Sequence, residues 1–354
     1  MYIYFLALFL IACAFLFDFI QVKWVRNTVL WCAAITFSLF AGLREVGVDR
    51  DSEAYHLLYS YMAYFPWKDI WKSQVIYAME PGFVFLNKLS YSLGFSFPAF
   101  MLLIQIATAA TLYPLIKRYS DYPMLSVIMY ISYFYFFRDF TQIRYALACA
   151  LLMSSLFALK EKKSIHWLLL QIAAGLIHNA TWIGIFIVPM VRLIRNRYFY
   201  LVLPLIGYAI GKLQPVRLLV SFFQLPEQLT RYLSSDMDIS ASIVSSVFAF
   251  LVTILMALFY DQLNEKIKGF PIFYAVLSIA ACIGFMFLDF PIMQRVSGAL
   301  LTSVIWIMPW LISLFTIRDS PVRHVALLMY FLVLSLFVLY GIRILNSGLL
   351  EPYS

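Results

Sequence analysis

Ten separate runs of apolar residues divide this chain of 354 residues, and each is close in length to a helix that crosses a membrane. Such a helix needs about 20 apolar residues. The runs lie at about 2–20, 27–43, 96–116, 122–137, 140–159, 198–213, 241–260, 270–288, 294–316 and 322–344. Because lipid offers no partner to backbone polar groups, we predict an all-α, polytopic transmembrane protein. We expect a single membrane domain over 1–354 with about 10–12 membrane helices.

The composition excludes several other classes of protein. Hydrophobic residues make up 64% of the chain and charged residues 12%, whereas soluble proteins average about 45–50% and about 25%. A soluble globule, a disordered chain and a nucleic-acid-binding protein are therefore excluded. The net charge of +8 indicates basic membrane flanks and anionic ligands. The four cysteines lie in apolar runs without paired spacing, which indicates neither a zinc site nor a disulfide framework.

The lysines and arginines of the short loops assign the two sides of the membrane, because such loops stay in the cytoplasm. This rule places both termini outside. The first run has no basic residues before it, so we expect it to be a retained span and not a signal peptide. The two long polar connections, 44–95 and 214–240, then lie outside, and we expect amphipathic helices in both. The protein therefore presents its chemistry to the outer side.

The apolar stretch 165–191 does not fit a single straight span. Basic clusters at 160–163 and 192–197 flank it, and both should lie inside. We therefore predict a re-entrant or broken hairpin of two short helices that turns near His178 and Asn179. Irregular backbone of this kind persists at membrane depth only where protein or a water-filled cavity covers it. The alternative is one long tilted helix with the second basic cluster outside.

The first outer loop contains candidate carboxylates. Arg44 ends a span, where its head can meet a phosphate at the level of the lipid headgroups. Asp49, Asp51 and Glu53 follow at alternate positions, where a carboxylate could take a proton from a sugar hydroxyl. The alternative is a solvated acidic loop that caps a helix. Glu80, further along, could cap the next helix or touch a substrate.

The fifth run carries charges inside an apolar segment. Four polar side chains share one helical face at spacings of three, four and seven, namely Arg138, Thr141, Gln142 and Tyr145. Arg144 lies deeper. Charges within a span are costly and usually face a cavity or a partner. Two guanidinium groups with nearby hydroxyl and amide donors suit a pyrophosphate. The alternative is that Arg138 reaches the interface while Arg144 bonds to Asp139 or to a backbone carbonyl.

Further candidates come from the later part of the chain. His178, at the expected hairpin turn, is either a packing residue or a functional one. Arg231 lies in the second outer loop, and Arg295 starts a span at the outer face. A basic ring at one membrane face would then contain Arg44, Arg138, Arg144, Arg231 and Arg295. Such a ring suits a lipid-linked pyrophosphate; the alternative is ordinary binding of anionic lipid headgroups.

This combination of segments resembles the EpsG family, the Wzy-like polymerases of exopolysaccharide and O-antigen. The matching residues follow the family's order and are Gly42-Leu43-Arg44, Gly47, Asp49 to Tyr55, Glu80, Gly82-Phe83, Ile143-Arg144, Ala146, Ala148, Ile177-His178-Asn179-Ala180 and Arg295. The resemblance implies a GT-C-like polysaccharide polymerase in the bacterial inner membrane. Such an enzyme moves a growing glycan from undecaprenyl pyrophosphate to a lipid-linked repeat unit at the periplasmic face.

With this resemblance we expect catalytic roles for Asp49, Glu80 and His178. Since Asp49 is followed by Arg50-Asp51, which carboxylate is the base stays open. The substrate-binding residues would be Arg44, Tyr55, Arg138, Gln142, Arg144, Arg231 and Arg295. The expected partners are the undecaprenyl-pyrophosphate-linked oligosaccharide, membrane lipid and a chain-length regulator. We expect no cofactor, no metal and no nucleic acid.

Two other functions fit the same architecture. One is a sugar transferase that uses a polyprenyl-linked sugar, or an O-antigen ligase. The other is a flippase or transporter of lipid-linked glycan without chemistry. The chain shows no internal repeat of the kind that inverted-repeat transporters have, and it contains no phosphate-binding nucleotide loop. Both observations favour an enzyme over a transporter.

Overall fold

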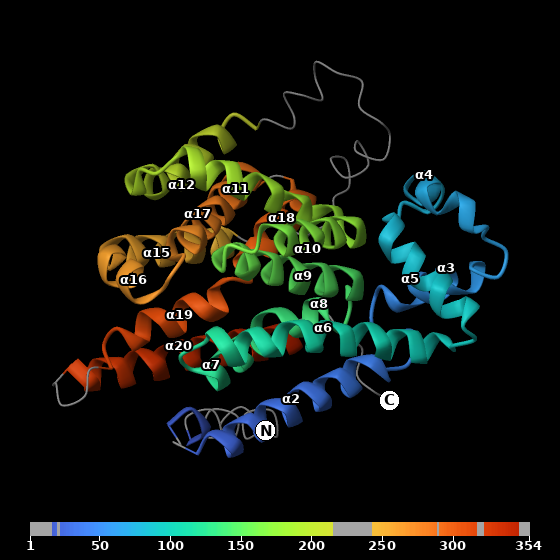
Figure 1. Cartoon of the computed structure of the whole chain (residues 1–354), viewed down its shortest axis with the longest axis horizontal. Coiled ribbons are helices and arrows are strands. Elements are labelled where there is room, and N and C mark those ends of the chain that lie inside the picture. Colours follow the sequence, from blue (N-terminus) through green and yellow to red (C-terminus); the bar gives the residue numbers. More distant parts are fainter. Residues whose placement is uncertain (1–15, 20–21, 215–242, 289, 317–321, 347–354) are drawn as a thin grey trace.

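The computed structural model describes residues 16–19, 22–214, 243–288, 290–316 and 322–346, and within these ranges it contains helices and no β-strand (Figure 1). The first part of the chain forms α2 (Lys23–Gly42), α3 (Ser52–Tyr61), the 3-10 helix Trp67–Lys72, α4 (Ser73–Tyr77), α5 (Pro81–Ser92), α6 (Phe97–Tyr119), α7 (Pro123–Tyr130), α8 (Phe136–Arg138), α9 (Ile143–Lys160) and α10 (Ser164–Ile177). The second part forms α11 (Ile183–Leu193), α12 (Arg197–Gly211), α15 (Ile243–Leu258), α16 (Tyr260–Lys266), α17 (Phe270–Met286), α18 (Pro291–Leu301), α19 (Val304–Ser313) and α20 (Val322–Leu345). A π-helical segment, Ile131–Tyr135, joins α7 to α8.

Five helical segments in the described part of the chain are long and apolar enough to cross a membrane. They are Lys23–Gly42, Phe97–Tyr119, Ile143–Lys160, Ile292–Ser313 and His324–Leu345. The pair α15 and α16 makes a sixth if it is one span bent by 80°. The prediction of an all-helical, multi-pass membrane protein is therefore confirmed. Fewer helices than the expected 10–12 reach spanning length, because several apolar runs form helices of 10–17 residues.

Two parts of the sequence-based assignment fall outside the described residues. The first run, 2–20, is described only from residue 16, and the second outer loop only at residue 214.

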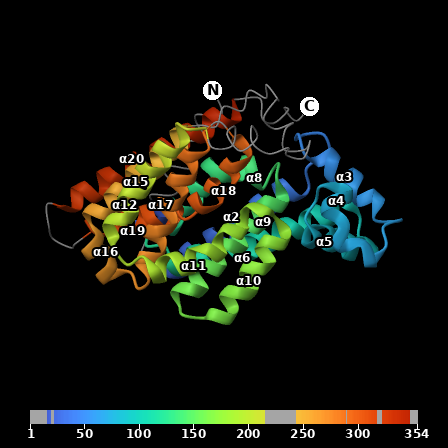
Figure 2. The same cartoon turned by 90° about the horizontal axis from the view of Figure 1, so that it is seen from above.

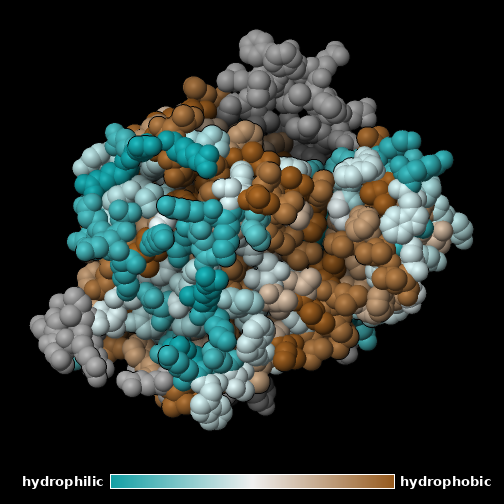
Figure 3. Space-filling model, viewed as in Figure 1, coloured by the Kyte–Doolittle hydropathy of each residue, from teal (hydrophilic) through white to brown (hydrophobic). Residues whose placement is uncertain are grey.

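Figure 3 shows a broad hydrophobic area over the middle of one face, with hydrophilic side chains on both sides of it. This distribution agrees with helices whose middle parts face lipid and whose ends face water.

Polar contacts sort the connections between helices into two groups at opposite ends of the bundle. We call the first group the Glu161 end; it comprises 120–122, 161–163, 194–196 and 259–269 with the adjoining helix ends. These contacts hold it together: Arg118–Glu161, Asp121–Lys266, Arg197–Asp261 and the Trp310 indole donating to the Tyr119 carbonyl. We call the second group the Glu80 end; it comprises 44–95, 139–142 and 178–182 with the adjoining helix ends. The charge rule assigns the connections of the Glu161 end to the inner side and those of the Glu80 end to the outer side, and this sidedness stays a prediction.

The stretch 165–191 folds back on itself. His178 has an extended backbone that ends α10, and a 3-10 turn leads from it into α11. A Cβ built on Gly184 would lie 2.1 Å from Oε1 of Gln171, and one on Gly175 would lie 2.4 Å from the Trp182 ring. In a straight helix, positions 171 and 184 would be about 20 Å apart. The predicted break near His178 is therefore confirmed, and one long tilted helix is excluded.

The first long connection forms a helical lobe at the Glu80 end, made of α3, the 3-10 helix, α4 and α5. Figures 1 and 2 both show the lobe beside the ends of the bundle helices. Its own apolar core is made of buried side chains that include Tyr55, Leu58, Met62, Phe83 and Phe100. Gly82 brings α5 against α10, because a Cβ there would lie 2.7 Å from the backbone oxygen of Leu176. This contact places the start of α5 on the hairpin.

Candidate active site

The centre of the candidate site is an ion pair between the lobe and the bundle. Nη1 of Arg144, in the first turn of α9, donates to Oε2 of Glu80, the residue before α5. Oε1 of Glu80 accepts the backbone N–H of Asn179 at 3.1 Å, where the hairpin turns. The side chains of Arg144 and Glu80 are 17% and 5% exposed. One buried carboxylate thus joins the lobe, α9 and the hairpin.

Tyr55 is a second partner of Arg144. Its hydroxyl forms a hydrogen bond with the guanidinium, and the charge of Arg295 also acts on it. Burial raises the pKa of Tyr55 to about 12, so the hydroxyl stays protonated at neutral pH. The structure therefore brings together three of the expected substrate-binding residues, Tyr55, Arg144 and Arg295.

His178 lies in the same cluster. Its ring is 4.8 Å from the ring of Tyr145, and the charges of Arg144, Arg295 and Arg138 act on it. Nδ1 accepts the backbone N–H of Ala180 at 3.2 Å. An Nδ1 acceptor leaves the proton of the neutral imidazole on Nε2. The charges of all three arginines thus act on His178, and its contact with the turn fixes its tautomer.

Arg138 is enclosed by protein groups. Its Nη1 donates to Oγ1 of Thr302 at 2.6 Å and its Nη2 to the carbonyl of Gly298. Its guanidinium also lies over the rings of Phe134 and Tyr145, at 4.2 and 4.8 Å from their centroids. Two of its five N–H donors are thus used within the protein, and its expected contact with a pyrophosphate stays a prediction. Arg138 attaches the end of α8 to α18.

Arg295, in contrast, has no carboxylate partner among the residues that the structure describes. It is partly exposed near the start of α18. Its neighbour Gln294 fixes this part of the helix by donating to the carbonyls of Gly284 and Phe287, at 2.8 and 3.0 Å. The Tyr145 hydroxyl donates to the carbonyl of Arg295 itself. Its guanidinium is therefore available to an anionic ligand.

Arg44 and Asp49 form a separate structural unit. Nε of Arg44 is 2.6 Å from Oδ2 of Asp49, and both side chains are fully buried. Oδ1 of Asp49 accepts the backbone N–H groups of Asp51 and Ser52, both at 3.0 Å, and so caps the start of α3. Both carboxylate oxygens are thus engaged. These are the contacts of a residue that caps a helix start, and a role for Asp49 as the base stays a prediction. Gly47, with φ of +97°, makes the bend between the two residues.

The remaining expectations divide as follows. Gln142 is buried directly before α9, and its Oε1 has no hydrogen-bond partner in the described part of the chain. Arg231 lies outside the described residues. In the ranges that the structure describes, no three side chains of His, Cys, Asp or Glu are grouped to hold a metal ion.

Two contributors to the site were missed by sequence reasoning. Tyr145 contacts His178, Arg138 and the backbone of Arg295, and its place on the Arg138 face was the available signal. The backbone N–H of Asn179 carries no side-chain signal. The cluster as a whole holds three guanidinium groups, with Glu80 and the buried Asp139 as its nearby carboxylates. The excess of positive charge suits an anionic ligand.

Comparison with known proteins identifies the family. The family model described as the EpsG family matches residues 27–354, and so includes every candidate residue named above. No curated protein and no solved structure matches the chain. The EpsG family consists of polysaccharide polymerase-like membrane proteins. Because the match extends over all but the first 26 residues, this multi-pass membrane protein belongs to the EpsG family.

Proposed function

We propose that this chain is a polysaccharide polymerase of the bacterial inner membrane. It transfers a growing glycan from undecaprenyl pyrophosphate to a lipid-linked repeat unit at the periplasmic face. The observation that carries the proposal is the Arg144–Glu80 pair at one end of the bundle, together with His178, on which the charges of Arg144 and Arg295 act. Guanidinium groups bind phosphate oxygens in pairs, and a pyrophosphate offers several such oxygens.

The proposed step exchanges one glycosidic bond for another. The bond from the anomeric carbon of the donor glycan to the pyrophosphate oxygen breaks, and a bond from that carbon to an acceptor hydroxyl oxygen forms. The hydroxyl proton passes to a carboxylate, and the lipid pyrophosphate leaves with the bonding electrons. Arg144 and Arg295 stabilise the negative charge that develops on the leaving group.

Glu80 is the carboxylate that we propose as the general base. Both carboxylates use their two oxygens, but the partners of Glu80 include Arg144, whereas those of Asp49 are Arg44 and the start of α3. An incoming pyrophosphate would compete with Glu80 for Arg144, and a released Glu80 would then be free to accept the proton. The Nε2–H of His178 would orient one of the two reactants.

The function is tested by the lipid-linked glycans that accumulate in cells. Deletion of the gene should leave single repeat units on the lipid carrier and remove long chains. Long chains that persist on the lipid carrier in the deletion strain would refute the proposal and favour the ligase.

The site is tested in the same strain. Expression of Arg144→Ala or Arg144→Lys at normal levels should reduce chain growth by about 100-fold or more, as expected for the loss of a transition-state donor. Arg118→Ala, in an exposed ion pair at the Glu161 end, is the matched control and should restore long chains. A chain-length distribution near that of the wild type from both Arg144 variants would remove Arg144 from the site.

A further inference from the structure

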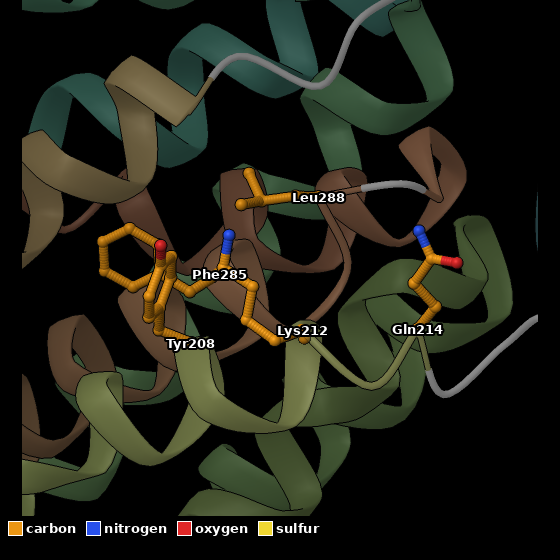
Figure 4. A pocket seen from close by; sticks show the side chains of 6 residues that line it. Tyr208, Lys212, Gln214, Phe285 and Leu288 are labelled. Carbon is orange, nitrogen blue, oxygen red and sulfur yellow. The ribbon is translucent and has the colours of Figure 1, made fainter.

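A second candidate site lies between α12 and α17, at the Glu80 end. The structure contains a cavity there of about 270 Å³. It is lined by Tyr208, Gly211, Lys212, Gln214, Phe285 and Leu288 (Figure 4). The six residues belong to the end of α12 and the end of α17, so the cavity lies where both helices finish.

The walls of this cavity are fixed by close helix packing. A Cβ on Gly207 would lie 2.4 Å from the carbonyl oxygen of Cys282, and one on Gly211 would lie 2.4 Å from that of Phe285. The backbones of α12 and α17 are therefore in direct contact below the cavity. A preformed wall of this kind costs little to order when a ligand binds.

The lining combines one cation with two aromatic rings. The rings of Tyr208 and Phe285 meet edge to face, with centroids 5.8 Å apart. Nζ of Lys212 lies 5.0 Å from the centroid of the Tyr208 ring. Figure 4 shows the Lys212 ammonium group between Leu288 and the rings, with Gln214 on the other side of the cavity. Apolar walls with a few polar groups are typical of small-ligand sites.

The charge of Lys212 is not balanced locally. No carboxylate in the described residues forms an ion pair with it. Lys212 shares this property with Arg295, near the start of α18. Gln294 links the two places, because it donates to the carbonyls of Gly284 and Phe287 at the end of α17. The cavity and the arginine cluster thus flank the same α17–α18 connection.

We propose that this cavity is a subsite for one sugar residue that carries an anionic substituent. The aromatic rings would pack against the apolar C–H face of the sugar ring, and Lys212 would bind the charged group. This inference rests on the proposed function, because a glycan chain held at the arginine cluster would place one of its residues in the cavity. The polymer or its repeat unit would then contain an acidic sugar.

The test measures binding and does not depend on turnover. Purified full-length protein in detergent is mixed with methyl β-D-glucuronoside or with the neutral methyl β-D-glucoside, and binding is followed by saturation-transfer NMR. We expect a clear signal for the glucuronoside and a signal at least about threefold weaker for the glucoside, since a charge-assisted contact is lost. Lys212→Gln should reduce the glucuronoside signal to the level of the glucoside. Lys268→Gln, an exposed lysine at the Glu161 end, should leave it unchanged.

Three results would overturn the subsite. They are equal signals from the two sugars, a glucuronoside signal that Lys212→Gln does not change, and full displacement of the glucuronoside by equimolar inorganic phosphate. The last result would show that the cavity recognises charge without a sugar ring. Tyr208→Ala should weaken both sugars, and Tyr208→Phe, which keeps the ring, should not. Arg144→Ala should stop chain growth but keep glucuronoside binding, so failure of the proposed function and failure of the subsite give different results.

Discussion

The two ends of the bundle use the same ion pair, arginine with glutamate, in opposite environments. At the Glu161 end, Glu161 meets Arg118 and, at 2.8 Å, Lys163, whose side chains are 63% and 54% exposed. At the Glu80 end, Glu80 meets Arg144 and the backbone of Asn179, and both charged side chains are largely buried. The first pair lies where water screens it, and the second lies where protein replaces water.

This difference is the one expected if the proposed site lies at the Glu80 end and the ion pairs at the Glu161 end are structural. Exposed pairs contribute roughly 0–1 kcal/mol each, so those at the Glu161 end can be changed at little cost. A buried pair loses the hydration of both charges, which its mutual attraction offsets only in part. At the Glu80 end, we expect that an anionic ligand would offset the lost hydration of the arginines by binding to them. Burial alone does not mark a functional charge in this protein, because the Arg44–Asp49 pair is also fully buried and lies at the start of α3. The Arg144–Glu80 pair differs from it because its partners join the lobe, α9 and the hairpin.

The largest expected effect comes from replacing each of the two glutamates, Glu80 and Glu161, with glutamine in separate variants. Glu80→Gln removes the proposed base and leaves Arg144 without its charged partner. We expect chain growth to fall by about 100-fold or more, the usual contribution of a general base. Glu161→Gln removes an exposed carboxylate and should change chain growth by less than about twofold. The measurement is the length distribution of lipid-linked glycan at matched protein levels.

The same pair of variants can contradict the comparison. Equal losses of chain growth from Glu80→Gln and Glu161→Gln would mean that both substitutions reduce activity by destabilising the folded protein. Thermal unfolding of the two purified variants provides the control, because a folded but inactive Glu80→Gln assigns the loss to the site.

A smaller effect on activity, together with a clear loss of stability, is expected for Arg138→Ala. The substitution removes the charged donor that the Gly298 carbonyl shares with the Thr302 hydroxyl, and it removes the contact with Thr302 itself. A hydrogen bond from a charged group contributes about 1.5–3 kcal/mol. The Tm in detergent should therefore fall measurably, whereas Arg118→Ala at the Glu161 end should leave it unchanged. If Arg138→Ala keeps the wild-type Tm and still loses activity, the residue binds the substrate and does not position α18.

Two glycines of the lobe give the next test. A Cβ on Gly82 would lie 2.7 Å from the backbone oxygen of Leu176, so Gly82→Ala should push α5 away from α10 and move Glu80, two residues earlier. Overpacking of this kind costs about 1–3 kcal/mol, and we expect a loss of activity of about tenfold. Gly94→Ala is the matched control, because nothing lies within 4 Å of its Cβ position, although its φ of +79° strains it slightly. Equal activity in both variants would show that the packing of α5 against α10 does not determine the geometry of the site.

A structural feature of this protein could be predicted from the sequence where neighbouring residues determine it, and not where distant residues do. The hairpin break at His178 was predictable, because basic clusters on both sides of one apolar stretch cannot be satisfied by a straight helix. That Arg144 faces a partner inside the protein was also predictable, because it is a charged residue within an apolar run. The partners of Arg138 were not, since Gly298 and Thr302 lie about 160 residues further along the chain.

Asp49 shows a different kind of limit. An aspartate before a helix can be a cap or a base, and the sequence alone does not show its two backbone contacts or its pairing with Arg44. The lengths of the helices could not be predicted from the hydropathy pattern of the sequence either. The hairpin helices end at Ile177 and Leu193, and the chain reverses between them at His178.

The smallest expected effect concerns the pH dependence of the Glu161 end. The hydrogen bonds from Lys163 and Tyr119 hold the pKa of Glu161 at about 2, below its ordinary value of 4.5. A depressed carboxyl pKa gives stability that is complete above the unfolded-state value and disappears as the pH falls through the folded-state value. The difference in Tm between the wild type and Glu161→Gln should therefore be constant from neutral pH down to about pH 5 and should close between pH 4.5 and 2. Because the pair is exposed, the difference should be small and should shrink further in high salt. A difference that grew as the pH fell would mean that Glu161 is protonated in the folded state, and the contrast between the two ends would then no longer hold.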